Sequence, residues 1–195
     1  MIQNVVFIGA IVQLVGISVY IREIIRGNTK PNKISWLMWA ITPFIATAAA
    51  ISDGVRWATL PVFMAGFTAL LVFIISFINP KAYWKLETFD YICGACSILA
   101  LALWAITHEP LVAIIFSIIS YMFGAITTII IAWRYPETES IWTYMAGLFN
   151  AVTCFFALKI FSIAELAFPV YLVLESGLFV ALIYRGKNLV KLKRR

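Results

Sequence analysis

The chain has 195 residues, of which 63% are apolar and 12% are charged. A soluble domain is roughly 45–50% apolar and about 25% charged, and a chain of this length has no soluble core large enough to bury the excess. The composition therefore predicts an integral membrane protein. It argues against a disordered chain, and three Cys and one His disfavour a disulfide scaffold and a soluble metalloenzyme.

The net charge is +6, and the basic residues gather beside hydrophobic segments. Six of the fifteen Lys and Arg residues lie in residues 185–195, and most of the others flank apolar runs. Basic clusters in such places set membrane topology and attract anionic lipid head groups. The distribution predicts a lipid bilayer as partner and no nucleic acid.

Seven segments are long and apolar enough to span a membrane, which takes about 20 mainly apolar residues. The fourth is the shortest. The predicted fold is therefore all-α, with seven transmembrane helices. The segments are 4–26, 34–52, 58–79, 91–107, 111–134, 140–158 and 165–184.

The charge distribution also predicts the topology. With the N-terminus outside, all Lys and Arg residues except Arg56 and Lys159 fall in cytoplasmic segments or at their borders. This is the excess that the positive-inside rule requires. The sequence thus predicts an external N-terminus and a cytoplasmic C-terminus. Short loops and the absence of glycosylation sequons favour the plasma membrane of a bacterium, that is, the bacterial inner membrane.

An internal repeat relates the two halves of the chain. A shift of 105 residues overlays the second segment on the sixth, and a shift of 108 overlays the third on the seventh. Prolines carry most weight in this match, because a helical proline removes a backbone hydrogen bond. The alternative is chance similarity between apolar stretches. The principal pairs are Pro31 with Pro136, Ser35 with Ser140, Trp39 with Tyr144, and Pro61 with Pro169.

The repeat predicts two three-helix bundles, in residues 1–80 and 111–186. A linker helix lies within residues 81–110, and a basic cytoplasmic tail occupies residues 187–195. Three crossings would invert the second bundle, and the linker helix restores its orientation. The result is a parallel 3+1+3 repeat with a cavity between the bundles.

This arrangement resembles the SWEET and PQ-loop superfamily of seven-span transporters. Residues 30–36 (KPNKISW) match the basic loop and the Ser of the family's second helix, while the Pro-Gln pair of the family is absent. Trp39 and Tyr144 stand where SWEET proteins place aromatic residues, and Phe67 and Glu175 stand in place of their paired Asn. The resemblance implies a transporter of a small solute and leaves its identity open.

Five polar residues lie at similar depth when each segment is centred in the bilayer, and Glu175 is the most informative of them. Charged residues at the bilayer centre cost roughly 2.5–3.5 kcal/mol on insertion scales. We therefore predict that Glu175 lines a central site, binds a cationic group or carries a coupling proton, and has Asn150 as its hydrogen-bond partner. The alternative is a protonated Glu175 that only ties the sixth and seventh segments together. The five residues are Gln13, Thr68, Tyr121, Asn150 and Glu175.

Trp39 and Tyr144 are candidates for a cytoplasmic gate that clamps a flat or sugar-like solute. The alternative is an interfacial aromatic belt, which Trp36 and Trp142 would share. Pro43 is a candidate hinge for motion of the bundles, or a simple kink.

Other residues have structural explanations. Pro61 and Pro169 fit the first turn of their helices, and Glu137 and Glu139 complement the dipole at the start of the sixth segment. The pair Cys93 and Cys96 is interpreted as small packing residues. His108 lacks a ligand set for a metal.

The sequence therefore predicts a transporter or facilitator that moves a small polar metabolite by alternating access, without cofactor or metal. The candidate solutes are a sugar, an amino acid, a vitamin or a cation-bearing molecule. The alternative is a non-transporting receptor or sorting protein on the same fold. An enzyme is disfavoured, because one embedded carboxylate without a base or metal makes a poor active site. The oligomeric state is open, and a homo-oligomer is allowed.

Overall fold

The computed structural model describes residues 4–78, 85–107, 109–158 and 162–193. Each predicted segment coincides with one α-helix, and the described residues contain no strand, so the prediction of an all-α fold is confirmed. The α-helices are α1 (Val5–Arg26), α2 (Lys33–Ser52), α3 (Leu60–Ile75), α4 (Thr88–Thr107), α5 (Pro110–Arg134), α6 (Ile141–Thr153) and α7 (Ile163–Lys193). Three short 3-10 turns are η2 (Trp57–Thr59), η3 (Pro136–Thr138) and η4 (Cys154–Phe156).

Five of these helices are long and apolar enough to cross a membrane: α1, α2, α3 extended by η2, α5, and the first part of α7. Their outer faces expose large apolar side chains, such as Ile11 at 62% and Leu174 at 67%. Exposed apolar surface on several neighbouring helices is unfavourable in water and favourable in lipid. The helices therefore indicate a membrane protein.

The sixth helix is shorter than predicted, and it is α6 rather than α4 that is the shortest. The hydroxyl of Thr153 donates to the carbonyl of Asn150 at 2.6 Å, and the chain then tightens into η4. Side-chain bonds of this kind compete with regular helix geometry near a helix end. The prediction of one continuous helix over 140–158 is therefore wrong after Thr153.

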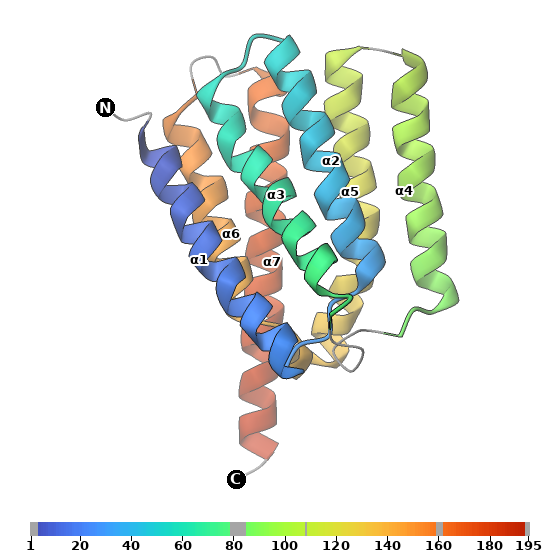
Figure 1. Cartoon of the computed structure of the whole chain (residues 1–195), viewed down its shortest axis with the longest axis vertical. Coiled ribbons are helices and arrows are strands. Elements are labelled where there is room, and N and C mark those ends of the chain that lie inside the picture. Colours follow the sequence, from blue (N-terminus) through green and yellow to red (C-terminus); the bar gives the residue numbers. More distant parts are fainter. Residues whose placement is uncertain (1–3, 79–84, 108, 159–161, 194–195) are drawn as a thin grey trace.

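The seventh helix is longer than predicted at both ends. The Ser162 hydroxyl accepts the backbone N–H of Glu165 at 3.2 Å, as expected of an N-capping residue. Pro169 consequently lies inside α7 and not in its first turn, which corrects the prediction. Pro61 does lie in the first turn of α3, as predicted. The helix also continues to Lys193, below the rest of the bundle in Figure 1.

The helices run alternately up and down, so that α1 begins at one end of the bundle and α7 ends at the other (Figure 1). We call the end where α1 begins the upper end, and the end where α1 stops and α2 begins the lower end. Helix α3 packs against α1 and α2, and α7 packs against α5 and α6. The two groups of three meet where α1 contacts α6 and where α2 contacts α5, while α4 lies outside the ring against α5.

Glycines bring the helices close together where the two groups of three meet. A Cβ atom added to Gly16 of α1 would lie 2.3 Å from the Cβ of Ala146 in α6. One added to Gly124 of α5 would lie 3.2 Å from the Cβ of Met38 in α2. Small residues permit such close backbone contact between apolar helices. Both contacts lie near the centre of the bundle, beside the cavity described next.

Candidate functional site

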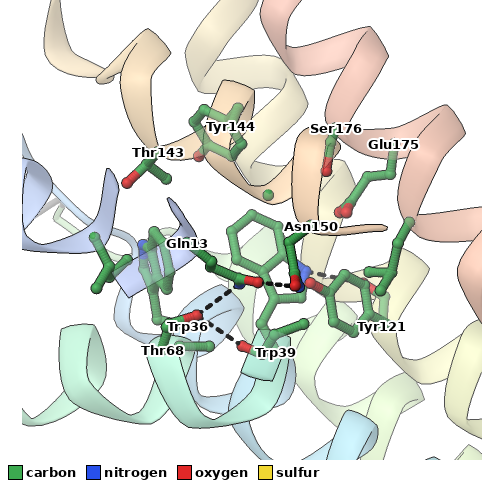
Figure 2. A pocket seen from close by; sticks show the side chains of 15 residues that line it. Gln13, Trp36, Trp39, Thr68, Tyr121, Thr143, Tyr144, Asn150, Glu175 and Ser176 are labelled. Carbon is green, nitrogen blue, oxygen red and sulfur yellow. Dashed lines mark hydrogen bonds between the residues drawn. The ribbon is translucent and has the colours of Figure 1, made fainter. Parts of the chain in front are cut away.

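A cavity of about 60 Å³ lies at the centre of the ring formed by α1, α2, α3, α5, α6 and α7 (Figure 2). It has room for roughly four water-sized groups, at about 15 Å³ for each. The structure brings all seven predicted binding residues to its wall. These are Gln13, Trp39, Thr68, Tyr121, Tyr144, Asn150 and Glu175. Trp36, Thr143 and Ser176 also line the cavity and were not singled out from the sequence as binding residues.

A chain of hydrogen bonds crosses one wall of the cavity and joins three helices (Figure 2). Gln13 of α1 donates its Nε2 hydrogen to the hydroxyl of Thr68 in α3 at 2.9 Å. Asn150 of α6 donates from Nδ2 to Oε1 of Gln13, and also to the carbonyl of Pro61 at 2.9 Å. Gln13, Thr68 and Asn150 are all buried, so the chain is shielded from bulk solvent.

Backbone carbonyls at both ends of this series of hydrogen bonds determine which side chain donates and which accepts. The Thr68 hydroxyl donates to the carbonyl of Met64 at 2.8 Å, so it accepts from Gln13. The Pro61 carbonyl is only an acceptor, so the amide nitrogen of Asn150 must face it. The oxygen Oδ1 of Asn150 is therefore the free end, and it is buried without a hydrogen-bond partner in the described part of the chain.

Glu175 is the one acidic residue in the cavity wall, and the described lining contains no Lys, Arg or His. Its side chain is 8% exposed, and its Oε1 has no hydrogen-bond partner among the described residues. Figure 2 shows its carboxyl group pointing into the cavity, on the same side as Ser176. The predicted hydrogen bond between Glu175 and Asn150 is wrong, because the Asn150 amide nitrogen is used by Gln13 and Pro61.

Aromatic rings from α2, α5 and α6 form another part of the wall. Trp39 stacks on Tyr121 with centroids 5.6 Å apart, and Tyr144 stacks on Phe179 at 4.4 Å. The indole N–H of Trp39 donates to the carbonyl of Tyr121 at 3.3 Å. Trp39 and Tyr144 are buried, so the belt interpretation is wrong for them, whereas Trp142 is 59% exposed and fits it. Their role as a gate stays a prediction.

A buried glutamate closes the lower end beside the cavity. Glu139, just before α6, is 1% exposed, and its Oε2 accepts from the hydroxyls of Tyr20 at 3.2 Å and Tyr144 at 3.1 Å. The helix-dipole explanation is therefore insufficient for Glu139, while Glu137 is exposed, as that explanation requires. The sequence carries no local signal for this contact, because Tyr20 lies 119 residues away.

Hydroxyl groups make a second polar contact at the lower end. Ser35 of α2 lies 2.6 Å from the hydroxyl of Thr127 in α5, and Thr128 donates to Ser35 at 3.0 Å. The backbone N–H of Lys30 also donates to the carbonyl of Thr138 at 3.2 Å. These bonds join the first three helices to the last three.

The upper end is closed mainly by small apolar side chains. The thiol of Cys154, at the end of α6, donates to the carbonyl of Ala58 at 2.7 Å. The surrounding cluster is rich in Ala and Val and contains no aromatic residue among its buried members. These members are Val6, Ala49, Ala50, Val55, Ala58, Ala113, Ile114, Cys154 and Ala157.

The sequence also singled out a proline, two cysteines and a histidine outside the set of binding residues. Pro43 is buried inside α2, which is one of the helices that line the cavity, and its role as a hinge stays a prediction. Cys93 is a buried cysteine in α4. His108 and the side chain of Cys96 lie outside the described residues. No group of three or more His, Cys, Asp or Glu in the described ranges is placed to hold a metal ion.

Comparison of the chain with protein-family models, with curated proteins and with solved structures finds no match.

Proposed function

We propose that the chain is a seven-span membrane transporter or facilitator of a small polar solute, which moves by alternating access through the central cavity. The observation that carries the proposal is the cavity itself. It carries buried polar side chains within an apolar helix bundle, and separate sets of contacts join the two groups of three helices toward its lower and upper ends. Such a site between two closures favours transport over a receptor, whose pocket would open to one face.

The helix contacts support a duplicated 3+1+3 architecture. When α1, α2 and α3 are exchanged with α5, α6 and α7, each principal contact in the ring becomes another one. The contact of α1 with α6 becomes that of α5 with α2, and the contact of α3 with α1 becomes that of α7 with α5. This is the pattern expected of two bundles related by a twofold axis along the membrane normal.

Residues at matching positions of the two bundles line the same cavity. Thr68 and Ser176 differ by the 108 residues that relate α3 to α7, and Trp39 and Tyr144 differ by the 105 that relate α2 to α6. The shift of 108 also pairs Gln13 with Tyr121 and the close-packed Gly16 with Gly124. These pairs support the resemblance to the SWEET and PQ-loop superfamily.

The basic residues support an external N-terminus and a cytoplasmic C-terminus. Those at the lower end of the described bundle outnumber those at the upper end, where Arg56 lies. An excess of Lys and Arg marks the cytoplasmic side of a membrane protein. We place the chain in the bacterial inner membrane on this basis and that of its short loops. The residues at the lower end are Arg22, Arg26, Lys30, Lys33 and Arg134.

Osmotic swelling of proteoliposomes tests the proposal. Vesicles that contain the protein are mixed with glycine, ribitol or ethanolammonium chloride, and light scattering reports solute entry. At least one solute is expected to enter faster than it enters protein-free vesicles. If all three solutes entered at the same rates as they enter protein-free vesicles, transport of small polar solutes would be contradicted.

A matched pair of variants locates the path. Ala69→Leu adds apolar volume to the cavity wall and is expected to reduce entry about tenfold or more. Ala48→Leu makes the same change on the exposed side of α2 and is expected to leave the rate unchanged. Equal effects of the two variants would place the path elsewhere.

A further inference from the structure

We propose that the solute is a compact protonated amine, a class of organic cation that Glu175, Asn150 and the aromatic wall would recognise together. This inference rests on the proposed transport function for its biological meaning. As a statement about binding, it stands on the cavity alone.

The cavity presents acceptors whose hydrogen-bonding capacity is unused. Oε1 of Glu175 and Oδ1 of Asn150 are buried and lack a partner among the described residues. Both side chains are more than nine-tenths buried, and both line the same space. A buried polar atom without a partner is unfavourable, because it has lost its bonds to water. A ligand that relieves Oε1 of Glu175, which points into the cavity, is one that donates hydrogen bonds.

Most donors of the wall are occupied within the protein, and the indole N–H of Trp36 is the exception, because it is buried without a hydrogen-bond partner in the described part of the chain. Nε2 of Gln13 and Nδ2 of Asn150 are used in the polar chain, and the indole N–H of Trp39 is bonded to a carbonyl. The Thr143 hydroxyl donates to the carbonyl of Gly16 at 3.3 Å, and the Tyr144 hydroxyl donates to Glu139. Ser176 and Tyr121 contribute hydroxyls, which donate or accept. The balance favours a ligand richer in donors than in acceptors.

The charge of the site points to a cation. Glu175 faces the cavity, and no basic side chain of the described lining balances it. A buried ionised carboxylate needs a partner of opposite charge, and an anionic ligand would be repelled by it. An ammonium group supplies both the positive charge and three N–H donors. It therefore pairs with Glu175, whose Oε1 has no partner among the described residues.

The aromatic wall and the volume select an organic cation of small size. Trp39, Tyr121 and Tyr144 present rings to the cavity, and cations are attracted to the faces of such rings. The volume of about 60 Å³ admits roughly four water-sized groups. A two-carbon amine fills this space, whereas a sugar ring would require the cavity to open.

A matched series of three compounds tests the inference on the purified protein in detergent. Ethanolammonium, ethylene glycol and glycolate each carry two carbons and a hydroxyl, and they differ in having charge +1, 0 or −1. Isothermal calorimetry and thermal unfolding are measured for each compound, with sodium chloride at the same concentration as a control. Ethanolammonium is expected to bind at least tenfold more tightly than the other two and to raise the unfolding temperature.

Two variants of α7 make the test specific for the cavity carboxyl group. Glu175→Gln is expected to weaken ethanolammonium binding roughly ten- to a hundredfold, because a charge-assisted bond is lost. Glu165→Gln changes another buried glutamate of the same helix, outside the cavity, and is expected to leave binding unchanged. If Glu175→Gln does not fold, the compound series on the unaltered chain still decides the question.

The inference is overturned if ethylene glycol or glycolate binds as tightly as ethanolammonium, if sodium alone gives the full effect, or if none of the compounds binds. An unchanged affinity in a folded Glu175→Gln protein has the same consequence. Failure of the transport proposal looks different. Ethanolammonium would then bind and depend on Glu175, but it would enter proteoliposomes no faster than protein-free vesicles.

Discussion

The lower and upper ends of the cavity are closed by contacts of different chemistry. At the lower end, Glu139 and Ser35 anchor buried hydrogen bonds between the two groups of three helices, and the rings of Trp36 and Tyr144 pack beside them. At the upper end, the described cluster consists of small apolar residues, and the Cys154 thiol donates to the Ala58 carbonyl. Hydrogen bonds between the two groups of three helices are therefore the main contacts described at the lower end, and packing of small apolar side chains is the main contact described at the upper end.

This difference predicts which end opens more readily. A hydrogen bond within a protein contributes about 0.5–1.5 kcal/mol to stability, and one to a charged group contributes about 1.5–3 kcal/mol. A thiol is a weak donor, and the surfaces of Ala and Val separate without breaking a network. We therefore expect the upper end to open first. In the proposed orientation, the cavity then communicates first with the outside.

The largest effect is expected from removing the carboxyl group at the lower end. Glu139→Ala leaves the hydroxyls of Tyr20 and Tyr144 without their acceptor and breaks the bond between α1 and the start of α6. We expect a loss of about 3 kcal/mol in the free energy of unfolding. Unfolding in mixed micelles, followed by circular dichroism, measures it.

Two further variants control for this result. Glu139→Gln retains an acceptor oxygen and should recover at least half of the loss. Glu137→Ala removes an exposed carboxyl group two residues away and should change stability by less than about 0.5 kcal/mol. If Glu139→Ala were as stable as the unaltered chain, the lower end would not be held by this cluster.

The sequence was sufficient for the seven helical segments and for the depth of the main polar residues of the cavity, but not for every helix end or every lining residue. Apolar runs and their breakers predicted seven segments, because helix length and burial in lipid are local properties of the chain. The depth of Gln13, Thr68, Asn150 and Glu175 followed from centring each segment, and the structure brings these residues together. Depth is a one-dimensional property that can be read along the chain.

The pairing of side chains was not predictable in the same way. Asn150 was expected to bond to Glu175, and it bonds instead to Gln13 and the Pro61 carbonyl. Glu139 was assigned to a helix dipole, and its partner lies on α1. Such contacts depend on the rotation and separation of helices, which close glycine contacts determine in three dimensions. The hydropathy of the chain does not contain this information.

The second largest effect is expected where α1 and α6 approach most closely. Gly16→Ala places a Cβ atom 2.3 Å from that of Ala146, so the two helices must separate. We expect a destabilisation of about 1–3 kcal/mol, together with a longer distance between the lower ends of α1 and α6. Spin labels attached to Arg22 and Glu137 after substitution by Cys measure that distance.

The matched control for this change is Gly177→Ala in α7. No described atom lies within 4 Å of a Cβ added there. Because alanine favours helix more than glycine, this variant should be neutral or more stable by about 0.5–1 kcal/mol. Equal destabilisation by Gly16→Ala and Gly177→Ala would show that close helix contact is not what the first substitution disturbs.

Chemical labelling compares the two ends directly. In a background with Cys93→Ala and Cys96→Ala, the native Cys154 reports opening of the upper end. Adding Ser35→Cys and Cys154→Ala places the single thiol at the lower end instead. We expect a maleimide to label the upper thiol roughly five- to tenfold faster, which corresponds to about 1 kcal/mol. Labelling in detergent and in liposomes, normalised to the rate in the unfolded chain, tests this.

The smallest effect is expected from Cys154→Ala at the upper end. This variant removes one weak donor and one sulfur atom, and the surrounding small residues can close over the space. We expect a loss of less than about 1 kcal/mol in the free energy of unfolding, because the Ala58 carbonyl loses only a thiol bond. The same unfolding assay as for Glu139→Ala allows the losses in the free energy of unfolding at the two ends to be compared directly. A loss as large as that of Glu139→Ala would mean that the upper end is held as firmly as the lower end. The expected order of opening would then have no energetic basis.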